Sequence, residues 1–214
     1  MKRILVINPN TTVSVTDKVV TACRSMQPDV EWDGATAAFG AAYIASEKSY
    51  AIAAHASLDA FDRHYAGHDA VLIACFGDPG LLALRETSGV PVLGLAQSSF
   101  LAAEALGPFA VVTGGKAWGP MLERFARMHR LDTQLAGIYT VELTGVQIAA
   151  APQQAIGELA GACRLGIAAG ARNILLGGAA LVGLASQLQQ RLSVPVLDNV
   201  LLAARAVVRA ADGQ

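Results

Sequence analysis

The sequence predicts an α/β protein whose strands form parallel sheets, and three observations support this fold class. Several short runs of apolar residues are unbroken by polar ones, which is the pattern of strands buried on both faces. Helical patterns lie between these runs, and such alternation is typical of a parallel sheet covered by helices. A long internal repeat indicates in addition that this arrangement occurs twice.

The expected strands and helices alternate along the whole chain. The apolar runs predict strands over residues 3–8, 70–75, 91–95, 109–113, 173–178 and 195–199. Apolar residues at helical spacing predict helices over residues 14–26, 116–129 and 153–169. A further helix is expected over 79–88, because Asp78 followed by Pro79 is typical of an N-cap and the first helical position.

The internal repeat relates residues 69–95 to residues 172–200. Each copy consists of an expected strand, a turn of small residues, a short helix and a Val-Pro-Val-Leu strand, and the match pairs Cys75 with Gly178. We therefore expect two similar lobes, with a cleft where the carboxyl ends of their strands face each other. The first lobe would comprise residues 1–97 plus 198–214, and the second residues 98–197.

Composition and charge limit the classes of partner that the protein is expected to bind. The chain has 214 residues, 53% of them hydrophobic, and a formal net charge of −1. Charged residues do not gather into runs, so no electrostatic footprint for nucleic acid or an anionic membrane is present. No apolar segment approaches the roughly 20 residues of a membrane span, and no signal-peptide cleavage site follows the short apolar start. We expect a cytoplasmic protein whose partner is a small molecule.

The three cysteines have different settings. Cys23 and Cys163 fall on the apolar faces of expected helices, where cysteine packs as a small hydrophobic residue. The three are far apart and form no C-x-x-C pair, so we expect neither a disulfide framework nor a metal site. Cys75 instead ends a buried strand, and ligands of open α/β sheets bind just beyond the carboxyl ends of the strands. Cys75 is therefore the candidate functional thiol.

Three turns carry a resemblance to a known family. INPNTT after the first strand, ACFGDPGL after a middle one and LLGGAAL near the end resemble the signature turns of the aspartate/glutamate/hydantoin racemase superfamily, closest to its hydantoin and allantoin racemase branch. The resemblance covers nearly the whole chain and implies two pseudosymmetric Rossmann-like lobes, frequent homo-oligomers, and no cofactor or metal. It further implies that one cysteine from each lobe inverts a carbon next to a carbonyl. Cys75 matches the first cysteine, whereas Gly178 stands where the second is expected.

The same resemblance implies which residues line the substrate pocket. They are Asn10, Thr11, Phe39, Gly40, Phe76, Gly77, Thr113, Gly114, Gly178 and Ala179. For Asn10 and Thr11, plain helix capping remains an alternative. Glycine at 114 and 115 would let backbone amides approach a ligand, and such turns suit a carboxylate, an imide or an enolate oxygen.

The chemistry of proton abstraction explains the thiol. A cysteine removes a proton next to a carbonyl if its pKa is lowered, and donors must stabilise the enolate that forms. We expect the N-terminus of helix 79–88 to lower the pKa of Cys75. With glycine at 178, Lys116 or Asp198 could supply the second proton-transfer group, although Asp198 is more typical of a cap for the last helix.

Three functions remain open from the sequence. The first is a racemase or isomerase acting by cysteine proton transfer on a hydantoin-like or amino-acid-like substrate. The second is a one-thiol decarboxylase of the arylmalonate type, and the third is a non-catalytic small-molecule binding protein. The four histidines show no metal-ligand spacing. A cysteine hydrolase would need a histidine near Cys75, a role for which His55 and His64 remain open.

Overall fold

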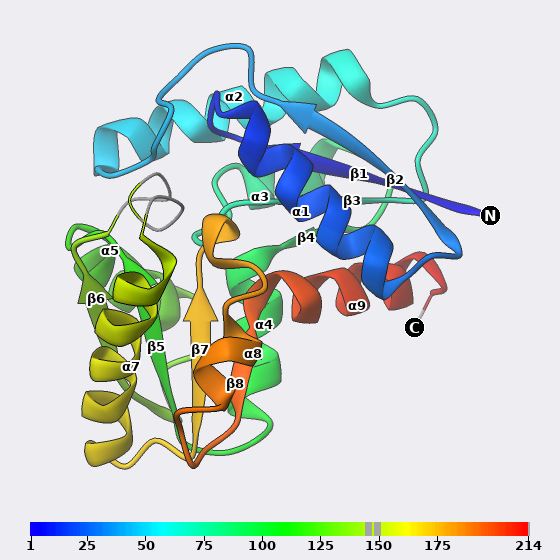
Figure 1. The fold of residues 1–214 in the computed structure, drawn as a ribbon. Coiled ribbons are helices and arrows are strands. Elements are labelled where there is room, and N and C mark those ends of the chain that lie inside the picture. Colours follow the sequence, from blue (N-terminus) through cyan, green and yellow to red (C-terminus); the bar gives the residue numbers. More distant parts are fainter. Residues whose placement is uncertain (144–146, 148–150, 214) are drawn as a thin grey trace. The chain divides into compact units, whose positions relative to one another are not determined.

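The chain divides into two compact units in the computed structural model, which describes residues 1–143, 147 and 151–213. Unit 1 comprises Met1–Ser98 with Val200–Gln214, and unit 2 comprises Ser99–Asn199. Each unit holds a four-stranded sheet with helices between its strands (Figure 1). Every strand pair in both sheets is parallel, which confirms the predicted α/β class.

Unit 1 has the strand order β2-β1-β3-β4. Its elements are β1 (Lys2–Asn8), α1 (Val13–Met26), β2 (Val30–Thr36), α2 (Glu47–His64), β3 (Ala70–Ile73), α3 (Leu81–Thr87) and β4 (Val92–Gly94). Two helices include the residues at which the units divide, α4 (Leu95–Glu104) and α9 (Asn199–Ala211).

Unit 2 repeats this topology with the strand order β6-β5-β7-β8. Its elements are β5 (Phe109–Gly114), α5 (Trp118–Met128), β6 (Leu135–Val141), α7 (Pro152–Ala168), β7 (Asn173–Gly177), the 3-10 helix η1 (Ala179–Leu181), α8 (Ala185–Gln189) and β8 (Val196–Asp198). The shared strand order agrees with the internal repeat of the sequence.

The predicted strands all exist, and their burial explains why. Residues Ile4–Ile7 of β1 and all four residues of β3 are at most 1% exposed, so both faces of these strands are covered. The fully buried thiols of Cys23 and Cys163 lie on α1 and α7, which confirms their packing role. All three cysteines lie in the described part of the chain, and none forms a disulfide.

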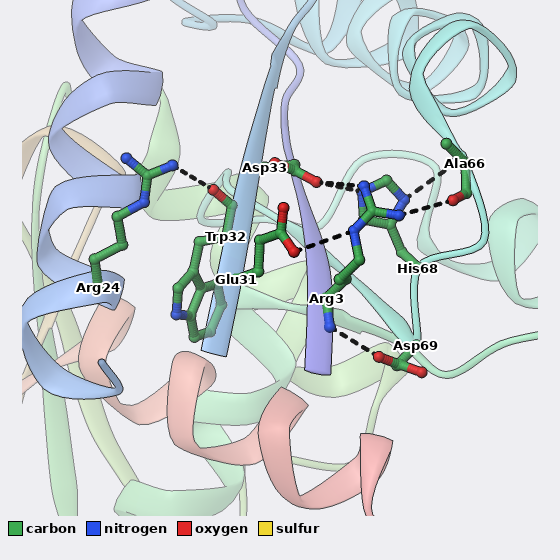
Figure 2. Close-up of polar contacts among 8 residues, drawn as sticks. All are labelled: Arg3, Arg24, Glu31, Trp32, Asp33, Ala66, His68 and Asp69. Carbon is green, nitrogen blue, oxygen red and sulfur yellow. Dashed lines mark hydrogen bonds and ion pairs between the residues drawn. The ribbon is translucent and has the colours of Figure 1, made fainter. Parts of the chain in front are cut away.

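A polar network ties β1 to β2 and to the turn that precedes β3 (Figure 2). The Arg3 guanidinium lies 2.9 Å from Asp33 Oδ2 and 3.4 Å from Glu31 Oε2, and it donates to the Ala66 carbonyl. His68 is 3% exposed, with Nε2 3.0 Å from Asp33 Oδ2. Its Nδ1 accepts from the Ala66 amide, so in the neutral form of the ring the proton lies on Nε2 and is donated to Asp33. This network fixes the neighbours of β1 in the sheet.

The described helices include none that combines the length and the apolar character needed to cross a membrane.

Candidate functional site

The expected pocket residues of unit 1 lie in turns that follow three adjacent parallel strands. Asn10 and Thr11 follow β1, Phe39 and Gly40 follow β2, and Cys75, Phe76 and Gly77 follow β3. Because the strands are parallel and adjacent, all these turns lie at the carboxyl edge of one sheet. The Thr11 amide donates to the Ala41 carbonyl at 3.2 Å and joins two of the turns directly.

The turn after β1 is held by its own asparagines. Asn10 Oδ1 accepts from the Thr12 amide at 2.9 Å and from Asn8 Nδ2 at 3.1 Å. Thr12 is the N-cap of α1, but its side chain does not cap the helix and instead donates to the Ala42 carbonyl. The Asn10 carboxamide therefore shapes the entry to α1, and Thr12 links this turn to the turn after β2.

The turn that carries Cys75 is held against α2. The Cys75 carbonyl accepts from the amides of Gly77 and Asp78, at 3.0 and 3.1 Å. Tyr50 donates from its hydroxyl to the Gly77 carbonyl at 2.6 Å, and Ser57 donates to the Pro79 carbonyl at 2.9 Å. Both side chains come from α2, which fixes the turn on either side of Asp78.

Asp78 does not cap the helix that follows it, so this prediction is wrong. Helix α3 begins at Leu81, and its N-cap is Gly80 with φ of 86°. Asp78 itself has a left-handed φ of 54°. Its oxygens accept instead from the amides of Ala96 and Gln97 in the first turn of α4, at 2.8 and 2.7 Å.

The expectation of a lowered pKa at Cys75 is also wrong. The residue is 7% exposed, and burial raises the pKa of its thiol, with a further increase from the charge of Asp78. Burial likewise raises the pKa of Asp78 to about 7, although bonds from Gln97 and Ala96 and the charge of Arg85 act in the opposite direction. Burial therefore favours the protonated form of the Cys75 thiol at neutral pH.

The expected pocket residues of unit 2 lie at the carboxyl ends of β5 and β7. Thr113 pairs with Gly177 in the sheet, and Gly178 and Ala179 follow directly. A Cβ at Gly178 would lie 3.8 Å from Thr113 Oγ1 and 3.6 Å from Leu181, which is ordinary contact distance. Space is thus available at Gly178, but its φ of 128° is a conformation that other residues rarely adopt.

Packing within unit 2 involves both glycines at the end of β5, Gly114 as its last residue and Gly115 directly after it. A Cβ at Gly114 would lie only 2.6 Å from the Leu143 carbonyl oxygen, so the backbone approaches too closely for a side chain. The Gly115 amide donates to the Val141 carbonyl at 2.7 Å. The Gly115 amide is thus already hydrogen-bonded within unit 2.

The strand registers support the match between Cys75 and Gly178. Val71 of β3 pairs with Val92, and Ile174 of β7 pairs with Val196. Cys75 and Gly178 each come four residues after the first member of these pairs. The repeat therefore holds in three dimensions within each unit, with a thiol at the strand end of unit 1 and no side chain in unit 2.

The two alternative proton-transfer groups have different surroundings. Lys116 is exposed in the turn after β5. Asp198 is 8% exposed, and its Oδ2 accepts from the Gly183 amide at 2.7 Å. The Asp198 carboxylate therefore holds the segment that follows η1.

Three of the histidines differ in exposure and in the residues that they contact. His55 is exposed and contacts the ring of Phe39 edge-on, with ring centroids 5.1 Å apart, and His64 is exposed at the end of α2. His68 belongs to the network around Arg3 and Asp33. Among the residues that the structure describes, no group of three or more His, Cys, Asp or Glu is arranged to hold a metal ion.

Tyr50, Ser57 and Gly94 are site residues that the sequence reasoning missed. The first two hold the Cys75 turn, and a Cβ on Gly94 would overlap the Asp78 carboxylate. A signal for the first two was present, because residues seven apart lie on one face of a helix. That signal becomes readable only once α2 is recognised, and α2 was not predicted.

Comparison with known proteins gives consistent similarities. The family model described as Asp/Glu/Hydantoin racemase matches residues 4–207. A hydantoin racemase of Pseudomonas sp. (strain NS671) is 32% identical over 203 residues, covering 93% of this chain and 82% of the relative. The crystal structure of allantoin racemase from Pseudomonas fluorescens has a TM-score of 0.92 at 30% identity, covering 97% of this chain and 91% of that one. A double mutant of arylmalonate decarboxylase has a TM-score of 0.75 at 20% identity, covers 100% of this chain and 94% of that one, and is alike in fold alone.

Proposed function

This chain belongs to the Asp/Glu/Hydantoin racemase family, and on that premise we propose its activity and the residue that performs it. The protein is a cofactor-independent racemase that acts at a carbon next to a carbonyl. Its substrate is a hydantoin-like or amino-acid-like small molecule with a carboxylate or imide group. Cys75 is the group that moves the proton.

The observation that carries this proposal is the setting of Cys75. It is the one cysteine of the chain that follows a strand at the carboxyl edge of a sheet, and its turn is fixed by Tyr50 and Ser57. Ligands of parallel α/β sheets bind at this edge. The other two cysteines are fully buried within helices.

The proposed reaction proceeds through an enolate. The Cys75 thiolate takes the proton from the substrate carbon, and the electron pair of the broken C–H bond moves onto the adjacent carbonyl. Return of a proton to the same carbon completes the exchange, and inversion requires that it arrive on the opposite face. Gly178 offers no side chain for that second step, so proton exchange at the face served by Cys75 should outpace inversion.

Racemisation of enantiopure 5-substituted hydantoins and allantoin, followed by polarimetry, tests the proposal. Cys75→Ala should lose on the order of 10²–10⁴ in rate, the usual contribution of a positioned acid or base. Cys23→Ala is the matched control, because that thiol packs inside α1, and it should retain activity. Retained activity in Cys75→Ala would contradict the role of the thiol. Absence of turnover with all substrates, with binding detected by calorimetry, would favour a non-catalytic binding protein.

One observation favours a second candidate, decarboxylation of an activated malonate. Burial and the Asp78 charge raise the pKa of Cys75, so the thiol holds its proton at neutral pH. In this reaction the C–C bond to one carboxylate breaks, CO₂ leaves, and the electron pair stays as an enediolate. Cys75 then gives its proton to the carbon and regains one from water.

The pH dependence separates the two candidates. Racemisation needs the thiolate, so its rate should rise with pH through the range in which a thiol with a raised pKa ionises. Decarboxylation needs the thiol, so its rate on phenylmalonate should not rise over the same range. Release of CO₂ that depends on Cys75 would establish the second candidate, and its absence would exclude it.

A further inference from the structure

A single buried carboxylate joins the Cys75 turn to the start of α4. Asp78 is 3% exposed, and its two oxygens accept from consecutive amides of that helix, those of Ala96 and Gln97. Residue 94 must be glycine for this contact, because a Cβ there would overlap the carboxylate. The arrangement keeps a charged group and a left-handed backbone inside the protein, both of which are costly.

Unit 2 makes a corresponding link, with the carboxylate on the other of the two matched segments. Gly94 and Asp198 each come two residues after the matched valines of β4 and β8, so they occupy equivalent positions. In unit 2 the carboxylate is that of Asp198, the last residue of β8. It accepts from the amide of Gly183 in the segment after β7. In both units, one buried carboxylate therefore connects the segment after the third strand to residues at the end of the fourth strand or just after it. The two units share this link, but the carboxylate comes from the segment after the third strand in unit 1 and from the fourth strand in unit 2.

The link in unit 1 ends close to the thiol. The Asp78 amide donates to the Cys75 carbonyl, as does the Gly77 amide, so the orientation of Asp78 is transmitted to Cys75 through the backbone. The neighbouring carbonyls of Gly77 and Pro79 are held by α2. The turn is thus fixed against α2 on one side and against α4 on the other, with Asp78 as the connection to α4.

We propose that Asp78 is a positioning residue for Cys75, holding the turn of residues 75–80 by its bonds to α4 so that the thiol points in one direction for proton transfer. This inference rests on the proposed function, in which Cys75 moves the proton. The negative charge has a second effect, because it adds to the burial that raises the pKa of Cys75. The amides of Gln97, Ala96 and Gly77 donate to the Asp78 carboxylate, and the positive charge of Arg85 offsets its negative charge.

The proposal is tested by removing the charge at residue 78 and by moving the carboxylate from residue 78 to residue 94. The variants are Asp78→Asn, which removes the charge, and the double variant Asp78→Gly/Gly94→Asp, which reproduces the arrangement of unit 2. Glycine tolerates the left-handed backbone at 78, and residue 94 has no positive φ that would exclude aspartate. The exposed Asp62 of α2 provides a matched control, Asp62→Asn.

Two readouts follow each variant. In an assay of deuterium uptake by an enantiopure 5-substituted hydantoin in deuterium oxide, Asp78→Asn should lower kcat about 10²-fold while KM changes less than about threefold. This fall is expected although the substitution increases the thiolate fraction of Cys75, since a misdirected thiol affects the transition state more than binding. Cys75 alkylation by iodoacetamide should reach its half-maximal rate at a lower pH, since each unit of pKa is tenfold in thiolate. The double variant should recover both values and Asp62→Asn should change neither. A folded Asp78→Asn protein with unchanged kcat and alkylation profile would overturn the proposal.

A measurement on the unaltered protein covers the case in which the variants do not fold. The amide NMR signals of Ala96 and Gln97 should titrate with a midpoint near 7, together with the Cβ signal of Cys75. A Cys75 signal that stays constant while those amides titrate would overturn the link. Both alkylation and NMR need no substrate, so a failure of the proposed racemase activity would be recognised separately from a failure of this inference.

Discussion

The Tyr50 hydroxyl donates a 2.6 Å hydrogen bond to the carbonyl of Gly77, two residues beyond Cys75. Tyr50→Phe removes this bond and leaves the carbonyl without its phenol partner. We expect unfolding to become easier by about 1 kcal/mol, and kcat to fall several-fold, because the turn gains freedom. Tyr65→Phe is the control, because Tyr65 stacks on Phe61 and its hydroxyl makes no hydrogen bond to the described residues. Equal effects of the two substitutions on kcat would show that the Tyr50 bond does not serve the turn.

The three thiols should react with iodoacetamide at different rates. Cys75 is 7% exposed and the other two are fully buried, so Cys75 should be labelled first in the native protein. Its raised pKa should nevertheless make labelling slow at pH 7, with an increase of about tenfold for each pH unit above that. Peptide mass spectrometry after short exposure measures both. Rapid labelling of Cys75 at pH 7 would contradict the raised pKa.

A thiol at residue 178 should increase inversion despite the backbone. The left-handed φ of Gly178 makes any side chain cost about 1–3 kcal/mol in stability, although contact distances leave room for a Cβ. Gly178→Ala carries the same strain without a thiol and is the control. Relative to it, Gly178→Cys should raise the inversion rate on the order of 10²-fold, because it adds a second acid or base. Equal inversion rates in folded forms of both variants would refute the matching of Gly178 to a catalytic position.

The network of Figure 2 predicts how stability depends on pH. Burial raises the pKa of Asp33, but the bonds and charges of His68 and Arg3 outweigh it and hold the pKa below its usual value. Stability from this group is therefore present above the unfolded pKa of about 3.9, and is lost as the pH falls through the lower folded value. Asp33→Asn should destabilise the protein at pH 7, and the difference should shrink toward pH 2.

Urea denaturation at several pH values measures this effect. Glu31→Gln is the control, because Glu31 is 44% exposed and lies 3.4 Å from Arg3, so its loss should change stability by less than about 0.5 kcal/mol. A difference between wild type and Asp33→Asn that stays constant from pH 7 to pH 2 would contradict the lowered pKa.

The sequence predicts best the strands that consist of an unbroken run of apolar residues. Strand β3 and the first four residues of β5 are apolar because both faces are covered. The edge strands β2 and β6 were missed, because VEWDGAT mixes buried and exposed residues and LAGIYTV is mostly half-buried. Neither forms the short unbroken apolar run that identified the others, including the edge strands β4 and β8. Reliance on such runs therefore overlooks edge strands in which polar residues or partial exposure interrupt the pattern.

The site shows the same limit more sharply. Cys75 could be selected as a candidate from the sequence because a strand end is a local feature. Asp78 was misassigned because its local pattern resembles a helix cap, whereas its partners Ala96 and Gln97 lie 18 and 19 positions away. Tyr50 contacts Gly77 over a separation of 27 positions. Contacts at such distances are set by the packing of α2 and α4 around the turn, which no short motif records.

Deuterium uptake at C5 of an enantiopure 5-substituted hydantoin tests the role of Cys75 most directly. The reaction is run in deuterium oxide and followed by NMR, with polarimetry on the same sample to measure inversion. The wild-type protein should incorporate deuterium at least about tenfold faster than it inverts the centre, and Cys75→Ser should lose this uptake by about 10² or more. Deuterium uptake by Cys75→Ser at the wild-type rate would contradict the assignment of Cys75 as the group that moves the proton.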